Sequence, residues 1–420
     1  IRPGPIVGNL VHPYINRRNG REPVTYIDSR FETVLERTLG VPLFQEQILR
    51  MAMVIADFTG SEAEELRRAM SFHRSEERML KVMAKLRVAM DQKGVIKDTQ
   101  NRIVDAIKSF ALYGFPESHA ISFALLAYAS AWLKRHRAVE FYASLLNNQP
   151  MGFYSCATLV KDAKRHGIRV LPVSVIDSEL GARVLNDHTL QLGLKQVRGL
   201  SHESAERLLE SREKGAWEDL DDFRLRSRLK KDEARVLAKI GALNGMVAHR
   251  REALWKVEKP IERDLFNWQA PCEKSSMVMP LEPMKQRERL EADYAGLGLT
   301  VGPHPMALMR KDLPHVWKAS DLVHGKDGQI VIVAGLVICR QRPSTAKGHV
   351  FVSLEDETGI ANAFVPSSTF EMYRLVVNQE PFLSIKGRLQ NIDHVISVYA
   401  LHIDPLPFDQ PLATQSYDFH

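Results

Sequence analysis

The stretch LGLKQVRGLSHESAERLLESR, from Leu192 to Arg212, decides how the middle of this 420-residue chain is built. An apolar segment leads into a tight turn around Gly199, and a segment with helical spacing follows. A second stretch, ARVLAKIGALNGMVAHRREALWKV from Ala234 to Val257, repeats the plan with a turn that begins at Gly241. The repeat predicts two consecutive units, each made of a helix, a glycine turn and a second helix.

Two such units resemble a tandem helix-hairpin-helix. A glycine turn lets backbone N–H groups approach a phosphate, and the helix that follows adds the positive end of its dipole. Basic residues around both turns suit a polyanion. The candidate contacts to a nucleic-acid backbone are Lys195, Arg198, Gly199, Lys239, Gly241, Asn244, Arg250 and Arg251. An ordinary pair of antiparallel helices has the same pattern, and the residues alone leave both interpretations open.

Five short strand-like runs follow between residues 329 and 405. In the second run, buried-type residues alternate with Phe351 and Ser353, as in a half-buried strand. A helical segment, STFEMYRLVVNQ, separates the third run from the fourth, which is the order of an OB-type barrel. Such barrels bind single strands through basic, aromatic surfaces, for which Phe351, Phe364 and Arg388 are the candidates. Both phenylalanines suit the core of the barrel equally well.

Upstream of the hairpins the pattern is helical. LFQEQILRMAMVIADF has apolar residues near a period of 3.6, and GSEAEELRRAM begins with a capping signature at Ser61 and Glu64. Further along, the sequence predicts a helix from about Ser155 to His166 and a short strand that ends at Pro172.

The most apolar segment runs from Ile121 to Leu133, within GFPESHAISFALLAYASAWLKRHRAVEFY. It is shorter than the roughly 20 residues that a bilayer span needs, so no membrane anchor is predicted. Its alanine, leucine and serine content favours a helix buried in a core. Ser118 precedes the run where a hydroxyl caps a helix, and no GxSxG context marks it as a nucleophile.

Composition places few limits on function. The chain carries a net charge of +6 and three cysteines, and no His/Cys cluster has zinc-binding spacing. A mildly basic balance is compatible with a phosphate-rich partner but does not require one. With no structural metal and no signal peptide, the sequence predicts a reduced, cytoplasmic protein. Because the sequence opens at Ile1 with IRPGP, we expect it to be a piece of a longer protein.

Several motifs, taken in order, resemble the C-terminal part of a bacterial C-family DNA polymerase, the alpha-subunit family of DNA polymerase III. They are RPGP (2–5), GREPVTY (20–26), LFQEQILRMA (43–52), LRRAM (66–70), SHAISFALLAYASAWLK (118–134) and YAGLGLTVGPHP (294–305). The hairpins and the barrel follow in family order. YGFPESHA, LLNNQPMGFYS and the short end after the barrel are most similar to the error-prone branch of the family.

The resemblance implies a multidomain α+β chain with helical fingers, a tandem helix-hairpin-helix and a C-terminal OB-type barrel. The implied domains are fingers at 1–150, the hairpin domain at 151–258, a connector at 259–328, the barrel at 329–405 and a tail at 406–420.

The resemblance also implies template-directed DNA synthesis with two Mg²⁺ ions held by carboxylates. In the family, the metal-binding aspartates lie in a palm that precedes the fingers. We therefore expect neither a catalytic residue nor a metal ligand in this chain, and no polymerase activity from it alone. The implied contacts to the incoming dNTP are Arg67, Arg68, His73 and Arg74. The replicative form has glycine and lysine after LRRAM, so His73 and Arg74 stand here as replacements for that lysine. Either of Arg67 and Arg68 also suits a salt bridge to the acids at 62–65.

The implied partners are primer-template DNA, dNTP and mutasome accessory proteins, including a catalytically inactive partner of Y-family type. A sliding clamp is a further candidate, because DQPLATQSYDF near the end faintly resembles a clamp-binding peptide. An alternative is a non-catalytic DNA-binding scaffold built from hairpin and OB modules. An adenylating ligase would need a KxDG motif, which the sequence lacks.

Overall fold

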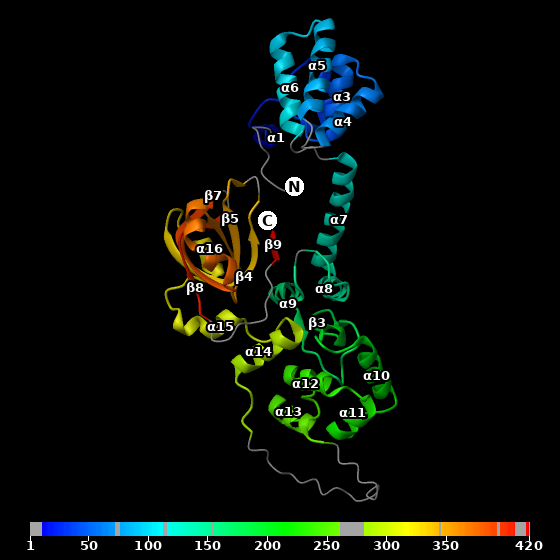
Figure 1. The fold of residues 1–420 in the computed structure, drawn as a ribbon, viewed down its shortest axis with the longest axis vertical. Coiled ribbons are helices and arrows are strands. Elements are labelled where there is room, and N and C mark those ends of the chain that lie inside the picture. Colours follow the sequence, from blue (N-terminus) through cyan, green and yellow to red (C-terminus); the bar gives the residue numbers. More distant parts are fainter. Residues whose placement is uncertain are drawn as a thin grey trace, which may run out of the picture. The chain divides into compact units, whose positions relative to one another are not determined.

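The computed structural model describes residues 11–71, 76–111, 116–152, 154–260, 281–343, 346–392, 395–407 and 417–419. The chain divides into two compact units, Ile1–Ser130 and Ala131–His420 (Figure 1).

The first unit is helical. Its helices are α1 (Val11–Arg18), α2 (Glu32–Leu35), α3 (Gln45–Ala56), α4 (Gly60–Ser71), α5 (Glu76–Gln92) and α6 (Lys97–Ala111), with 3₁₀ turns η1 (Ser29–Phe31) and η2 (Glu36–Thr38). The apolar period predicted in α3 is confirmed, because Ile48, Met51 and Ile55 are fully buried in one core with residues of α4, α5 and α6.

The predicted cap of α4 was wrong by two residues. Thr59, not Ser61, precedes the helix, and the Oγ atom of Thr59 accepts from the N–H of Glu62 at 3.3 Å. The carboxylate of Glu62 accepts in return from the N–H of Thr59 at 2.9 Å. Thr59 and Glu62 therefore form the reciprocal pair, and the carboxylate of Glu64 is left for other partners.

Helix α7 (Glu117–His136) corrects the prediction of a buried core helix. Figure 1 shows it as one long helix, and none of its described residues is buried. Leu125 is 68% exposed and Tyr128 is 76% exposed. The apolar composition of 121–133 predicted that the helix would be buried, but composition does not say which part of a protein would cover it. Ser118 lies inside the first turn rather than at the cap. Among the described residues, no helix combines the length and apolarity needed to cross a membrane.

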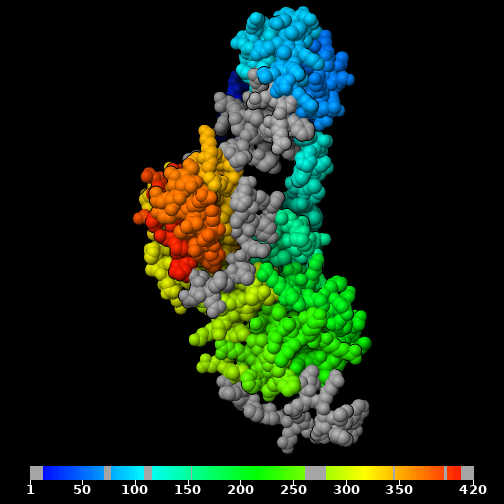
Figure 2. Space-filling view, in the orientation of Figure 1, coloured from blue at the N-terminus to red at the C-terminus, as the bar shows by residue number. Residues whose placement is uncertain are grey.

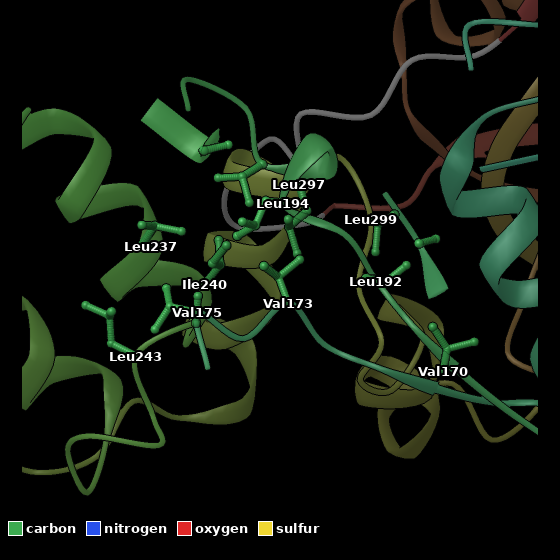
Figure 3. Packing of buried hydrophobic residues seen from close by; sticks show 14 of the residues in the cluster. Val170, Val173, Val175, Leu192, Leu194, Leu237, Ile240, Leu243, Leu297 and Leu299 are labelled. Carbon is green, nitrogen blue, oxygen red and sulfur yellow. The ribbon is translucent and has the colours of Figure 1, made fainter. Parts of the chain in front are cut away.

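The second unit begins with a helical region that also holds a small sheet. The helices are α8 (Ala138–Asn147), α9 (Cys156–Arg165), α10 (His202–Glu213), α11 (Leu220–Ser227), α12 (Lys231–Ile240) and α13 (Arg250–Glu258). The sheet contains β1 (Arg169–Leu171), β2 (Arg183–Asn186) and β3 (Thr189–Gln191), in the order β1-β3-β2. Figure 3 shows part of the hydrophobic core of this helical region, where Leu194, Leu237 and Ile240 lie in one cluster with Leu297. The predictions of α9 and β1 are confirmed, and Ser155 caps α9.

The first predicted hairpin lacks its leading helix. Only a 3₁₀ turn, η3 (Leu194–Gln196), stands between β3 and the Gly199 turn. The chain leaves β3 at Gly193, whose α-carbon packs directly on the backbone of Gly181. Leu192, Leu194 and Val197 are buried, so the apolar residues of this segment fill the core without forming an α-helix. The second predicted hairpin is confirmed, with α12, a turn and α13 in order.

Helix α14 (Gln286–Leu297) joins the helical region to the barrel. Leu297 packs in the core of the helical region, whereas Leu290 and Tyr294 pack with Leu336 and Phe382 of the barrel. The segments α15 (Pro305–Met309), η4 (Arg310–Asp312) and η5 (Ala319–His324) then lead into the barrel. Residues 261–280 of the predicted connector lie outside the described residues.

The predicted OB-type barrel is confirmed. Its elements are β4 (Ile330–Gln341), β5 (Val350–Glu355), β6 (Ile360–Val365), α16 (Ser367–Gln379), β7 (Phe382–Ile392) and β8 (Val395–Pro405). The strand order is β5-β6-β8-β7-β4, and pairing of β4 with β5 closes the barrel, which Figure 2 shows in yellow to red as a rounded body. β6 and β8 are parallel, and β9 (Tyr417–Phe419) adds a parallel strand to β4.

Candidate nucleic-acid interface

The Gly199 turn is exposed and open. Gly199 has φ +85°, a left-handed conformation that favours glycine, and the only atom near a β-carbon built there would be a methyl of Val236 at 3.9 Å. Ser201 then caps α10, its hydroxyl accepting from the N–H of Ser204 at 3.2 Å. The turn therefore presents bare backbone at the N-terminus of a helix, with the exposed side chains of Lys195 and Arg198 beside it.

Glu233, which no sequence motif had indicated, holds this turn in place. Its carboxylate accepts from the N–H of Ser201 at 3.1 Å, from the hydroxyl of Ser204 at 2.9 Å and from the N–H of Lys230 at 3.0 Å. Burial raises the pKa of Glu233, but these hydrogen bonds outweigh burial and lower it. The start of α12 is thus held against the start of α10.

The Gly241 turn is covered instead. Gly241 has φ +80°, and a β-carbon there would lie 2.7 Å from Nε of Arg250. Arg250 donates to the carbonyl of Lys239 at 3.1 Å and to the carboxylate of Asp293 at 2.7 Å. Arg251 pairs with Glu288. Both arginines therefore link α13 to α14, and they have fewer donors to offer a phosphate.

The remaining predicted residues of the hairpins are accessible. Lys239 and Asn244 are exposed. Lys195 is also exposed, and its ammonium donates to the carbonyl of Asn147 at 2.9 Å. Arg198 and Gly199 lie at the open turn, and Lys239 and Asn244 lie at the covered one.

The barrel carries an aromatic stripe on its outer surface. Phe351 on β5 is directly opposite Phe364 on β6, and Phe364 is opposite Tyr399 on β8. Tyr399 is in turn opposite Arg388 on β7. The rings of Phe351 and Phe364 lie 5.4 Å apart, and those of Phe364 and Tyr399 lie 5.6 Å apart. Since Phe351 is 41% exposed, the alternative that the phenylalanines form the core is wrong for this residue.

Two members of the stripe were not predicted. Tyr399 joins it through strand pairing, and His349 packs its ring 4.9 Å from that of Phe364. The pairing of β6 with β8 joins segments about thirty residues apart, so no local pattern indicates it.

Arg67 and Arg68 lie on α4, and both contact Glu64. Arg67 donates through Nη2 at 2.6 Å and through Nε at 2.7 Å, and Arg68 donates through Nε at 3.2 Å. Hydrogen bonds from Arg67 lower the pKa of Glu64 to about 2. The salt bridge that the sequence left open is therefore present, and both guanidinium groups stay exposed, at 45% and 71%. His73 and Arg74 lie outside the described residues.

The described residues contain no group of three or more His, Cys, Asp or Glu side chains arranged to hold a metal ion. The donor set for Mg²⁺ that the family implies does not fit the described part of this chain.

Residues 1–94 match the model of the bacterial DNA polymerase III alpha subunit finger domain, and residues 167–253 match a helix-hairpin-helix motif. The whole chain is 44% identical over 436 residues to an error-prone DNA polymerase of Anaeromyxobacter dehalogenans. The chain belongs to the bacterial C-family DNA polymerases. A second error-prone DNA polymerase, from Pseudomonas aeruginosa, is 42% identical over 429 residues, and it too is matched by the whole of this C-family chain.

This C-family chain spans 38% of the length of the Anaeromyxobacter protein and 41% of the Pseudomonas aeruginosa protein. Its fingers match contains Arg67 and Arg68, and its hairpin match contains both glycine turns. The aromatic stripe lies outside both matched segments. A solved structure of asparaginyl-tRNA synthetase from Pyrococcus horikoshii covers 19% of the chain and 20% of that protein, at 23% identity and a TM-score of 0.16. Similarity at that level says nothing about the fold of this chain.

Proposed function

We propose that this chain is the fingers, DNA-gripping and barrel part of an error-prone DNA polymerase that extends primers across damaged templates and so causes induced mutagenesis. Identity of 44% over the whole chain to an error-prone DNA polymerase is the observation that supports this most strongly. The open Gly199 turn and the aromatic stripe supply surfaces of the kind that such an enzyme needs for its DNA.

In this proposal Arg67 and Arg68 contact the triphosphate of the incoming dNTP. Their guanidinium groups are exposed and paired only weakly, because a surface ion pair contributes about 0–1 kcal/mol. Forked N–H donors suit phosphate oxygens, and a triphosphate offers them more charge and more acceptor oxygens than the one carboxylate of Glu64. The nucleotide therefore displaces Glu64 at small cost.

The hairpin region holds the duplex through its backbone. At the Gly199 turn, N–H groups at the start of α10 reach a phosphate, and Lys195 and Arg198 neutralise its neighbours. Contacts of this kind carry no sequence information, which suits a polymerase that must copy any template. The stripe of Phe351, Phe364 and Tyr399 stacks unpaired template bases, and Arg388 contacts their backbone.

The wider proposal covers the full-length protein. It includes primer-template DNA and dNTP as ligands, Mg²⁺ as cofactor at carboxylates outside this chain, and a cytoplasmic location in the bacterial cell. Mutasome accessory proteins, a Y-family-like partner and a sliding clamp remain proposed partners. Of the clamp-like peptide, residues 409–416 lie outside the described residues.

The test is binding of fluorescent primer-template DNA to the chain, measured by anisotropy over a range of salt concentrations. Gly199→Val should weaken binding, because its side chain blocks the turn and strains a backbone at φ +85°. Gly167→Val is the matched control, with φ +80° and no atom within 4 Å of a β-carbon. Lys195→Gln and Arg198→Gln should each reduce the salt slope by about 0.9. Equal affinity and slope for all four variants and the wild type would refute the proposal.

A further inference from the structure

A cavity of about 320 Å³ lies inside the second unit. It is bounded by the start of α9, the segment before α10, the end of α14 and strands β4 and β5. Its volume is at the lower end of the range for small-molecule sites. None of the roles proposed above uses it as a site.

The first turn of α9 forms one wall. Ser155, Cys156, Ala157 and Thr158 line the cavity, and the hydroxyl of Ser155 already accepts from the N–H of Thr158 at 3.2 Å. The N–H of Ala157 has no acceptor among the described residues, and the N–H of Cys156 meets only the thiol of its own side chain. Unpaired N–H groups and the positive end of the helix dipole together attract an anion.

A second wall carries positive charge. Arg198 lines the cavity, and its guanidinium packs directly on the α-carbon of Gly298, which has φ +69°. No hydrogen-bond or ion-pair partner of this guanidinium is found in the described part of the chain. Gly298 thus leaves room for Arg198 to lie flat against α14, with its donors unused.

Two buried polar atoms in the lining are also unpaired. Tyr294 is 1% exposed, and its hydroxyl has no hydrogen-bond partner among the described residues, nor does Nε2 of Gln149. Burial raises the pKa of Tyr294, so the hydroxyl remains a donor at neutral pH. Leaving such a group unpaired costs about 1–3 kcal/mol, which an acceptor oxygen in the cavity would recover.

One acid faces the cavity, but it is neutralised. Glu355 accepts from the ammonium of Lys161 at 2.6 Å and from Nη2 of Arg165 at 2.8 Å. With Arg198 added, the cations around the cavity outnumber this carboxylate. Every unpaired polar group in the lining that has been named is a donor, so the complementary ligand is an anion with several acceptor oxygens.

We propose that this cavity is a phosphate-binding site, in which the first turn of α9, Arg198, Gln149 and the hydroxyl of Tyr294 hold one phosphate group. The phosphate comes either from a free nucleotide or from the DNA backbone. The second source rests on the proposed function, and the first does not.

The test measures binding of three probes to the 420-residue chain by calorimetry: inorganic phosphate, deoxyadenosine monophosphate and a short oligothymidylate. Tyr294→Phe and Arg198→Gln should each weaken binding about tenfold or more, as expected for hydrogen bonds to a charged group. Arg374→Gln is the control, because Arg374 is an exposed arginine on α16, away from the cavity lining. If Tyr294→Phe weakens binding of the monophosphate but not of the oligonucleotide, the cavity takes free nucleotides, and the reverse result assigns it to DNA. Oligothymidylate held by the aromatic stripe is unaffected by this variant, because Tyr294 lies in the cavity lining.

A merely structural tyrosine gives the opposite result. If no ligand binds, Tyr294→Phe removes an unpaired buried hydroxyl and should raise Tm while leaving every probe affinity unchanged. Gly298→Ala displaces the guanidinium of Arg198 and should also weaken phosphate binding, whereas Gly94→Ala, at φ +68° with no neighbour within 4 Å, should not. The inference is overturned if no probe binds, or if Tyr294→Phe and Arg198→Gln bind every probe as the wild type does. Primer-template binding that still responds to Gly199→Val would then leave the proposed function standing.

Discussion

Glu355 is the residue whose replacement should change this chain most. It lies on β5 with none of its surface exposed, and its carboxylate accepts from Lys161 and Arg165, which α9 contributes. His304 Nε2 lies 3.8 Å away, within ion-pair distance if the ring is protonated. The carboxylate thus joins the helical region to the barrel, and we predict that Glu355→Gln loosens this junction.

The size of the effect follows from the charges. Burial raises the pKa of Glu355, but His304 and Lys161 lower it from 4.5 to about 2. That difference corresponds to about 3 kcal/mol, which agrees with about 3–5 kcal/mol for breaking a buried ion pair. Burial also lowers the pKa of Lys161, which means that burying its ammonium is unfavourable. This cost offsets part of the stabilisation that the ion pair with Glu355 provides. Without the carboxylate, the same ammonium is left buried and unpaired.

Amide hydrogen exchange measures this locally, which matters because a multidomain chain does not unfold in one step. In Glu355→Gln, the amides of α9 and β5 should exchange about 100-fold faster at neutral pH. In the wild type, the stabilisation is present above about pH 4.5 and is lost as the pH falls towards 2. Glu64→Gln is the control, because Glu64 also accepts from two arginines but is 39% exposed, and α4 should exchange almost as before. A folded Glu355→Gln chain with unchanged exchange in α9 would refute the reasoning.

Three further predictions concern the candidate interface. Phe364→Ala, at the centre of the stripe, should weaken single-strand binding by about 1–3 kcal/mol in a fluorescence titration, whereas Met372→Ala, which is exposed on α16, should not. Glu233→Ala should lower the free energy of local opening at the starts of α10 and α12 by about 2 kcal/mol in amide hydrogen exchange, because it leaves two N–H groups and a serine hydroxyl unpaired. Because the pKa of Glu233 is lowered in the folded chain, the wild type should also lose stability as the pH falls and this carboxylate is protonated. Glu64→Gln should raise dATP affinity up to about fivefold by removing the carboxylate that competes with the triphosphate for both guanidinium groups, and Arg68→Gln should lower it.

The barrel was predictable because its information is local. Strand β5 alternates between inward valines and the outward Phe351, and the turn at Asp356 closes through its side chain, which accepts from the N–H of Gly359 at 2.9 Å. The aromatic stripe was only half predictable. Tyr399 enters it through the pairing of β6 with β8, and register between distant strands depends on how the whole barrel closes.

In the sequence, the two glycine turns were equally good candidates for a contact with a nucleic-acid backbone. In the structure, the Gly199 turn is open and the Gly241 turn is covered. Gly199 and Gly241 have nearly the same φ, so their local conformations are equally suited to a backbone contact. What differs is the cover that Arg250 forms over Gly241 through its bond to Asp293, which lies on α14 beyond the connector. Helix α7 shows the same limit, since its composition predicted burial but no neighbour in the described residues buries it.

The shifted cap of α4 bears directly on nucleotide binding. Thr59 and Glu62 cap the helix, so the carboxylate of Glu64 takes no part in the cap. Glu64 lies three and four residues before Arg67 and Arg68, and side chains at these spacings meet on a helix. Adjacent residues of a helix project about 100° apart, yet the carboxylate of Glu64 accepts hydrogen bonds from both arginines. The carboxylate of Glu64 therefore occupies the place where a triphosphate is proposed to bind. A triphosphate carries more charge and more acceptor oxygens than one exposed carboxylate, so exchange favours the nucleotide, and the acid orients both guanidinium groups until it arrives.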